Sequence, residues 1–217
     1  MKKTILEIFT DKKLVEKIKT KLPYLFQLAE VDNSRDGKLG MEIGSARERI
    51  IIALLIYKFG EKNIKTDIGI TESETDVIVF KDPISIKTAT GKKISGIKLI
   101  WTVDPQKALE FSNRYLPSCD IIFVKINWGS TGFLYLFPKK AQDDVLKKIG
   151  RNNYIKLPKQ GTNPRGVEMS GNAIEELTNH KDTKKIEINW KREIVNYNPY
   201  ERWVDHWLED KNINSSK

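Results

Sequence analysis

An aspartate and a lysine occupy two arms of a short β-hairpin pattern, and together they suit the hydrolysis of a phosphodiester bond. In residues 75–88, Asp76 opens one β-branched run, a Lys-Asp-Pro turn follows, and Lys87 lies in the second run. A carboxylate is a hard oxygen ligand for Mg²⁺, and an ammonium orients water or stabilises charge that develops on a phosphate. The alternative is an ordinary ion pair across a surface hairpin.

The length of the turn decides which residues of this pattern meet. Side chains alternate along a strand, so Ser85 and Lys87 share a face. A two-residue turn places Asp76 on that same face, whereas a three-residue turn places it on the opposite face unless a bulge intervenes. The carbonyl of Ile86, between Ser85 and Lys87, is a second candidate metal ligand.

The segment before the hairpin predicts a helix that carries a further acid. Residues 45–59 are mostly apolar and end at Gly60, which predicts a buried, central helix. The sequence Ser45-Ala46-Arg47-Glu48 has the S-x-x-E pattern of a capping box, in which Glu48 reaches back to the amide of Ser45. Glu48 is also a candidate for the metal site, and Glu42 is the competing upstream acid.

The composition favours one sizeable domain with a polyanionic partner. The chain has 217 residues, and 38 Lys and Arg against 29 Asp and Glu give a formal net charge of +9. This excess indicates nucleic acid, although a lysine-rich proteome gives the same signal. One cysteine, Cys119, excludes an intrachain disulfide. The charged N-terminus does not fit a signal peptide, and the longest apolar run, 50–57, is too short to span a bilayer, so we expect a cytoplasmic protein without membrane contact.

The hydrophobic pattern predicts an α/β fold of the mixed α+β type. Helices are expected at residues 4–31, 45–59, 104–115, 141–150, 171–178 and 199–208. Strands are expected at residues 67–71, 76–80, 84–88, 97–103, 120–127, 132–137 and 185–190. After residue 150 the chain becomes polar and irregular.

Three segments together resemble the PD-(D/E)XK nuclease superfamily, and specifically its type II restriction endonucleases. They are 44–50, 75–77 and 85–88, in the helix–strand–strand order of that family. The resemblance implies a central mixed sheet flanked by helices, with Glu48, Asp76 and Lys87 as catalytic residues. It also implies Mg²⁺, with Mn²⁺ as its substitute, bound by Asp76, Ile86 and Glu48.

The chain departs from the family pattern at two positions. Thr75 replaces the proline of the motif, which matters little, and Ser85 replaces its second acid. The metal site therefore lacks one carboxylate, and the helix glutamate, Glu48 or Glu42, would have to supply the missing charge.

The runs 85–91 and 98–104 resemble the ThaI family of restriction endonucleases. This resemblance implies a homodimer that reads a short palindromic site in double-stranded DNA, CGCG, and cuts it to blunt ends. It also implies a methionine that wedges into the duplex, for which Met41 is the candidate; the alternative is an ordinary, partly exposed methionine. We expect one domain over 1–217, with a catalytic core at 42–137 and an elaboration at 150–217 for DNA recognition and dimerisation.

Polar loops are the candidates for reading the bases, because base discrimination needs Arg, Lys, Asn or Gln on a loop or edge. The residues expected to contact DNA are Met41, Ser85, Lys93, Arg151, Asn152, Thr162, Asn163 and Arg165. Arg165 would donate two hydrogen bonds to guanine, and Lys93 would contact the phosphates. Each loop is equally consistent with a Gly/Asn/Pro turn that has no ligand.

Two residue pairs near the C-terminus receive simpler interpretations. Trp203 and Trp207 have helical spacing and are expected to pack, at a dimer interface, rather than stack on bases. His180 and His206 are isolated in the sequence and suggest no metal cluster.

Two alternative functions remain open. A structure-specific nuclease of the same superfamily, such as a Holliday-junction resolvase, would share the catalytic residues but is usually shorter. A non-catalytic DNA-binding protein would keep the fold without the metal site, and Ser85 is the residue that favours this alternative.

Overall fold

A six-stranded mixed sheet lies at the centre of the computed structural model, which describes residues 4–35, 38–39, 42–69, 74–94, 96–158, 166–198 and 200–208. Its order is β11-β8-β7-β5-β4-β3, with β5 and β7 parallel and the other neighbours antiparallel. The strands are β3 (Ile64–Lys65), β4 (Val77–Val79), β5 (Asp82–Thr90), β7 (Asp120–Ile126), β8 (Ser130–Phe137) and β11 (Lys184–Trp190). The mixed α/β prediction is confirmed.

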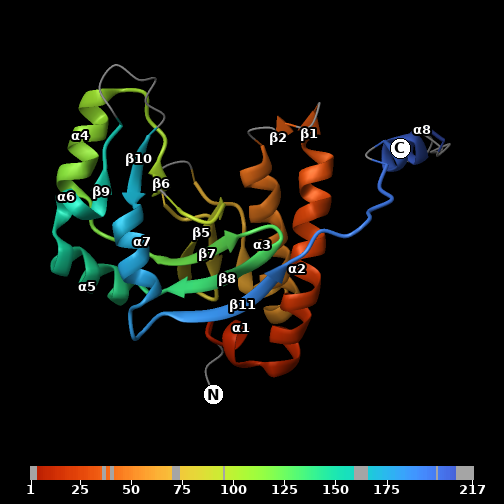
Figure 1. The fold of residues 1–217 in the computed structure, drawn as a ribbon, viewed down its shortest axis with the longest axis horizontal. Helices are drawn as coiled ribbons and strands as arrows, with labels where there is room; N and C mark the ends of the chain where they lie inside the picture. The colour runs from red at the N-terminus through yellow and green to blue at the C-terminus, as the bar shows by residue number, and fades with distance from the viewer. Residues whose placement is uncertain are drawn as a thin grey trace, which may run out of the picture.

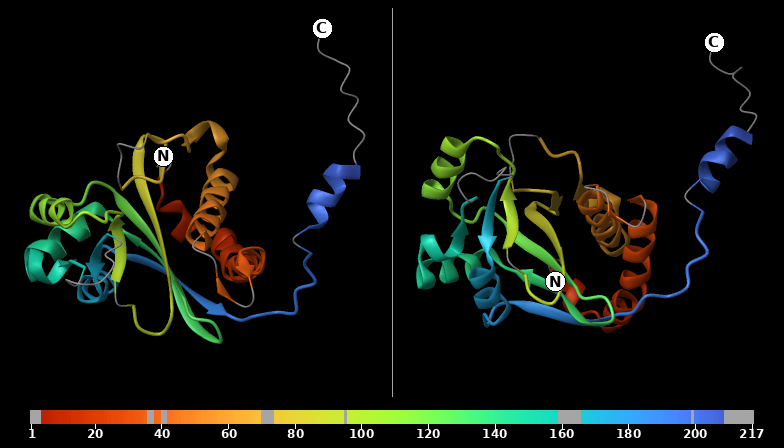
Figure 2. Two further views of the ribbon diagram at one scale, coloured as in Figure 1. Left: turned by 90° about the horizontal axis from the view of Figure 1, so that it is seen from above. Right: turned by 45° about the horizontal axis from the view of Figure 1, so that its top comes forward.

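Helices cover both faces of this sheet (Figures 1 and 2). On one side lie α1 (Glu7–Thr10), α2 (Lys12–Asp32) and α3 (Ile43–Phe59), followed by the short 3₁₀ helix η1 (Glu61–Asn63). On the other side lie α4 (Pro105–Arg114), α5 (Lys139–Ile149), α6 (Arg151–Tyr154) and α7 (Gly171–Thr178). Each side has its own hydrophobic cluster, one around Phe26, Leu55 and Trp190 and the other around Phe123 and Tyr154.

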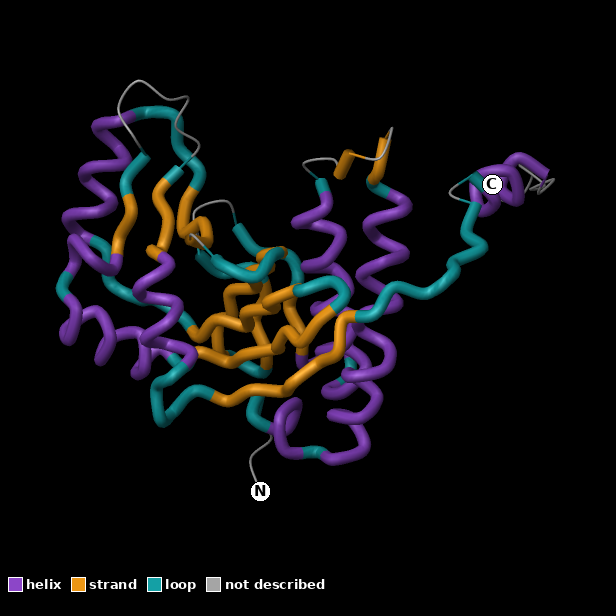
Figure 3. The backbone as a smooth tube through the Cα atoms, viewed as in Figure 1, coloured by secondary structure: helices purple, strands orange, loops and turns teal. Residues whose placement is uncertain are grey.

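A second, three-stranded sheet stands beside α4 and α7 (Figures 1 and 3). Its strands are β6 (Gly96–Ile100), β10 (Val167–Ser170) and β9 (Ile155–Lys156), in the order β6-β10-β9. The strands β1 (Ser34–Arg35) and β2 (Lys38–Leu39) pair with each other between the C-terminal end of α2 and the N-terminal end of α3. The segment after residue 150, expected to be an elaboration, is therefore part of both larger sheets, since β10 pairs with β6 and β11 with β8.

The N-terminal helices differ from the sequence-based expectation. The single helix expected at 4–31 is two helices, because the Asp11 side chain accepts hydrogen bonds from the amides of Lys13 and Leu14 and caps α2. Pro23 lies within α2.

The predicted capping box is wrong. The helix α3 begins at Ile43 rather than Ser45, and Glu42 at its N-cap makes no side-chain capping bond. Ser45 therefore lies inside the first turn, and Glu48 is released from the capping role. The helix is also not buried all round, since Arg47, Ile51, Leu55 and Phe59 form its buried face while Ala53 and Tyr57 are exposed.

The strand expected at 67–71 is displaced. Residues 67–69 are irregular, residues 70 and 71 lie outside the described residues, and β3 comes earlier. The helix α8 (Glu201–Leu208) stands apart from the body at the end of an extended segment (Figure 1). Across the described ranges, the structure contains no helix with the length and apolar character needed to cross a membrane.

Candidate active site

The β4–β5 hairpin brings Asp76, Ser85 and Lys87 to one face. Val77 pairs with Ile84 and Val79 with Asp82, which leaves a two-residue turn at Phe80 and Lys81. Phe80 adopts a φ of 61°, a left-handed conformation that few residues other than glycine accept. Asp76 consequently lies opposite Ser85, as the two-residue alternative predicts.

The Asp76 carboxylate accepts three hydrogen bonds on one oxygen, Oδ2. The donors are Ser85 Oγ at 3.1 Å, the Ile86 amide at 2.6 Å and Lys87 Nζ at 3.0 Å. The side chains of Asp76 and Lys87 are only 21% and 19% exposed. This is a fixed, half-buried carboxylate rather than an ion pair between mobile surface side chains.

Glu48 of α3 is the helix acid that joins Asp76 and Lys87. All three line the same hollow, of about 540 Å³. Burial raises the pKa of Glu48, the nearby Asp76 carboxylate raises it further, and Lys87 and Arg49 act against both. Glu42, the alternative acid, is exposed at the helix start and does not line the hollow. The arrangement thus places two carboxylates and one ammonium within electrostatic reach of one another.

The opposite wall of the hollow comes from the second sheet and contains an acid that the sequence did not indicate. Glu168 of β10 lies there beside Lys98 and Trp101, and its Oε2 is 2.9 Å from Lys156 Nζ. The Lys98 ammonium stacks 3.5 Å from the centroid of the Trp101 ring. No periodic signal marks the four residues of β10, and only the pairing with β6 brings Glu168 to this wall.

A second cluster corrects the view that His180 is isolated. Ligand atoms of Asp144, His180 and Asp182 lie within 4.8 Å of one another. Lys140 Nζ is 2.9 Å from Asp182, and His180 Nδ1 accepts a hydrogen bond from the Asp182 amide. These contacts join α5 to the turn after α7, and none of these residues lines the Glu48 hollow.

The predicted DNA contacts have three different outcomes. Ser85 is 2% exposed with its hydroxyl on Asp76, and the Arg151 guanidinium donates to the carbonyls of Ser112 and Tyr115, so both are structural rather than exposed to a ligand. Lys93 and Asn152 are exposed. The remaining candidates, Met41, Thr162, Asn163 and Arg165, lie outside the described residues.

Comparisons with known proteins identify relatives of the whole chain. The family model for "Restriction endonuclease ThaI" matches residues 8–209. A solved structure described as "Restriction endonuclease in complex with substrate DNA" is similar, with 54% sequence identity and a TM-score of 0.87. The similarity covers 93% of this chain and 97% of that one. No curated protein matches the chain.

Proposed function

The chain belongs to the ThaI restriction endonuclease family and is a type II site-specific endonuclease, and we propose that its active site is the hollow lined by Glu48, Asp76 and Lys87. There it would hydrolyse phosphodiester bonds of double-stranded DNA at a short palindromic site, CGCG, leaving blunt ends, as a cytoplasmic homodimer. The convergence of two carboxylates and a lysine on one hollow carries this proposal. The 54%-identical relative solved with substrate DNA supports DNA as the substrate.

The donors in the hollow suit Mg²⁺, with Mn²⁺ as its substitute. Burial and the Asp76 carboxylate raise the pKa of Glu48, and a divalent cation held by these two acids would relieve their repulsion. The three hydrogen bonds to Asp76 end on Oδ2, so Oδ1 is the oxygen that would hold the ion. The Ile86 amide faces Asp76, and because N–H and C=O of a strand residue point to the same edge, its carbonyl would be a further ligand.

A bound cation would polarise a phosphate oxygen and lower the pKa of a water molecule. The protein residues have separate tasks around it. Lys87, held 3.0 Å from Asp76, would donate to the phosphate oxygen on which negative charge develops. Ser85 keeps Asp76 oriented through its hydroxyl, and Glu48 supplies the second carboxylate that the motif lacks at position 85.

The proposed DNA contacts combine exposure with the sequence-based expectation. Lys93 and Asn152 remain in the set because they are exposed, and Met41, Thr162, Asn163 and Arg165 remain as sequence-based candidates. Ser85 and Arg151 leave it because their side chains are bonded within the fold. Lys93 would contact phosphate, which contributes affinity without sequence information.

Digestion of a mapped plasmid with Mg²⁺ tests this proposal. Wild-type protein should give discrete, blunt-ended fragments, while Asp76→Ala and Lys87→Ala should lose roughly 10³-fold or more in rate and still bind a duplex. The exposed Lys62→Ala is the matched control and should cut normally.

The same digest separates the alternatives, over which the family match favours a restriction enzyme. A smear would indicate a non-specific nuclease, cleavage restricted to four-way junctions would indicate a resolvase, and binding without cleavage would indicate a non-catalytic protein. Wild-type rates in both variants would refute the assignment of the hollow as the active site.

A further inference from the structure

The helix α8 presents an apolar stripe that its own chain leaves exposed. Tyr200, Trp203, Val204, Trp207 and Leu208 are between 50% and 89% exposed. Their spacing of three and four residues places them on one face of the helix. An isolated helix of eight residues is marginal in water, so this one needs a surface to pack on.

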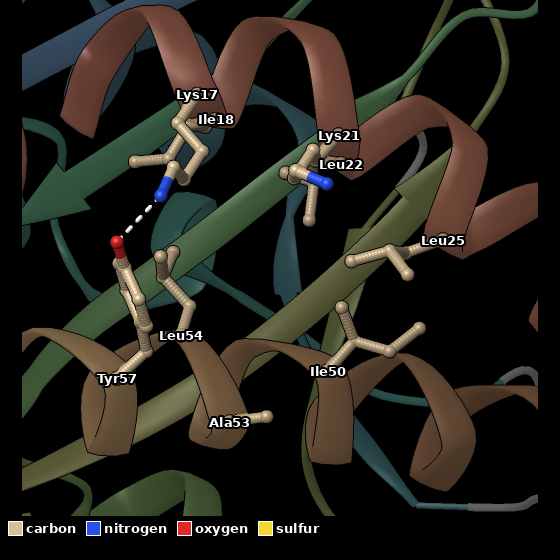
Figure 4. Close-up of a pocket in the computed structure, with 9 residues that line it drawn as sticks. All are labelled: Lys17, Ile18, Lys21, Leu22, Leu25, Ile50, Ala53, Leu54 and Tyr57. Atoms are coloured by element: carbon tan, nitrogen blue, oxygen red, sulfur yellow. Dashed lines mark hydrogen bonds between the residues drawn. The ribbon is translucent and has the colours of Figure 1, made fainter. Parts of the chain in front are cut away.

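An apolar groove of matching character runs between α2 and α3 (Figure 4). It encloses about 500 Å³, with Leu22 and Leu25 on the α2 side and Ile50 and Leu54 on the α3 side. The Lys17 ammonium donates a hydrogen bond to the Tyr57 hydroxyl across the groove, at 2.5 Å. An exposed apolar hollow of this kind is typical of a protein interaction site.

We propose that this groove binds the α8 helix of a second copy of the chain, so that two subunits exchange C-terminal arms. The proposal deepens the homodimer of the proposed function, since a palindromic site requires two copies of the active site.

The path of the arm favours exchange over packing on its own groove. Glu193 exchanges two backbone hydrogen bonds with the Gln27 side chain, and Arg192 bonds to Glu30. At 100° per residue, Gln27 and Glu30 lie on the face of α2 roughly opposite Leu25, which is the exposed leucine on the α2 side of the groove. Tyr197 then bonds to Asp32, the last residue of α2. The arm is thus led past the end of its own α2, and α8 lies beyond the body (Figure 2).

The charges on the two surfaces are complementary. Lys17 and Lys21 lie one turn apart along the α2 side of the groove. Glu201 and Asp205 lie one turn apart beside the apolar stripe of α8. Both pairs have the same i,i+4 spacing, so both lysines can meet an acid when the stripe enters the groove.

The buried area is sufficient for a stable dimer. Aromatic side chains bury roughly 150–250 Å² each. Trp203 and Trp207 are 53% and 89% exposed, so the tryptophans of two arms would bury roughly 400–700 Å². The other stripe residues and the groove surface add to this area, and stable interfaces bury about 1,200–2,000 Å² in total.

Arm exchange at this groove leaves the active site open. Along α3, Ile50, Leu54 and Tyr57 lie roughly opposite Glu48 at 100° per residue. The arm would therefore pack on the outer face of the helix whose inner face holds the catalytic glutamate.

Sedimentation of the full-length protein without DNA or metal tests the proposal, and its result is independent of cleavage. Wild-type protein should be a dimer at micromolar concentration. Trp203→Ser/Trp207→Ser in the arm and Ala53→Glu in the groove should each weaken dimerisation at least ~30-fold. Ile194→Ser, at a fully exposed position of the arm outside the stripe, is the matched control and should remain dimeric.

Mixing the two monomeric variants gives the sharpest result. The arm of the Ala53→Glu copy can still enter the groove of the arm variant, so the mixture should form a heterodimer with one intact contact. Lys21→Glu is a second groove variant at an exposed position, for use if Ala53→Glu unfolds.

A wild-type monomer, a dimer that neither set of variants weakens, or a mixture that stays monomeric would each refute arm exchange. A wild-type monomer that nevertheless cuts plasmid DNA would refute the dimer and leave the active site assignment intact.

Discussion

Two clusters of charge meet at the start of α3, and they differ in how fully the protein itself pairs their carboxylates. In the closed cluster, Glu30 is 3% exposed and accepts hydrogen bonds from Arg47, Arg192 and the Trp128 indole. In the open cluster, Glu48 and Asp76 share one ammonium, that of Lys87, at the wall of a hollow. Arg47 and Glu48 are neighbours in the chain, so one turn of helix contributes to both clusters.

The difference separates structural charge from functional charge. The acid of the closed cluster has donors for both oxygens, and the cluster joins α2, α3, the β7–β8 turn and the C-terminal arm. The open cluster has more negative than positive charge, and the repulsion appears as a raised pKa of Glu48. A cation would pair with the carboxylates of the open cluster, and a phosphate would pair with its ammonium. A ligand at the closed cluster would instead have to break hydrogen bonds that the protein already makes.

The largest expected effect comes from breaking the closed cluster. Glu30→Gln leaves Arg47, which is 4% exposed, without its anion. Removing one partner of a buried ion pair costs about 3–5 kcal/mol, so the free energy of unfolding should fall by that amount in urea titrations followed by circular dichroism. Glu16→Gln, which breaks the exposed pair with Lys19, is the control and should change it by about 0.5 kcal/mol or less. A loss below ~1 kcal/mol in Glu30→Gln would contradict the structural role.

Removing the acid of the open cluster should impair cleavage and leave the stability of the fold intact. Glu48→Gln should lower the cleavage rate about 100-fold, because it removes one of the two carboxylates proposed to hold the metal, and it should not weaken the fold. Initial rates on a short duplex measure the effect. Glu42→Gln is the matched control, since Glu42 is exposed. This variant should cut DNA at a rate within about twofold of that of the wild-type protein. A larger loss in Glu42→Gln would reverse the assignment of the helix acid.

Sequence reasoning predicted the hairpin but left the length of its turn open, and the turn is Phe80-Lys81 rather than the expected Lys-Asp-Pro segment, because Asp82 and Pro83 already belong to β5. Strand alternation and a two-residue turn are sufficient to place Asp76 with Lys87. The helix start was wrong because the S-x-x-E pattern carries no information on tertiary contacts. In the folded chain, Arg47 is buried against Glu30 from another helix, and α3 begins two residues earlier.

The other features missed from the sequence depend on long-range pairing. Glu168 reaches the hollow only because β10 pairs with β6, about seventy positions earlier in the chain. His180 meets Asp144 because α5 and the turn after α7 pack together. Hydrophobic periodicity describes single elements, so it cannot indicate which elements become neighbours.

A smaller effect is expected from the residue that holds Asp76. Ser85→Ala removes one of three donors to Oδ2 and leaves the Ile86 amide and Lys87 in place. A hydrogen bond to a charged group is worth about 1.5 kcal/mol, so cleavage should slow roughly tenfold. The apparent Mg²⁺ affinity should fall while the affinity for the duplex stays constant. Weaker duplex binding with unchanged Mg²⁺ affinity would instead restore the sequence-based expectation that Ser85 contacts DNA, and Ser130→Ala at an exposed position of β8 is the control.

The smallest effect concerns pH and reports the unsatisfied charge directly. Because the folded pKa of Glu48 is raised, the folded protein binds a proton there that the unfolded chain has lost. This contribution therefore makes the metal-free protein less stable as pH rises from the ordinary glutamate range through the folded pKa of Glu48. Glu48→Gln should remove that slope and be more stable than the wild-type protein at pH values above the folded pKa of Glu48.

Thermal unfolding of both proteins across pH 4–8, with and without Mg²⁺, measures this slope. Mg²⁺ competes with the Glu48 proton, so its stabilisation of the wild-type protein should grow as pH rises, and it should be much smaller in Glu48→Gln. Glu42→Gln should retain the wild-type slope in both conditions. If Glu48→Gln instead retains the slope, the titrating group belongs to another part of the fold, and the contrast between a closed and an open cluster at α3 fails.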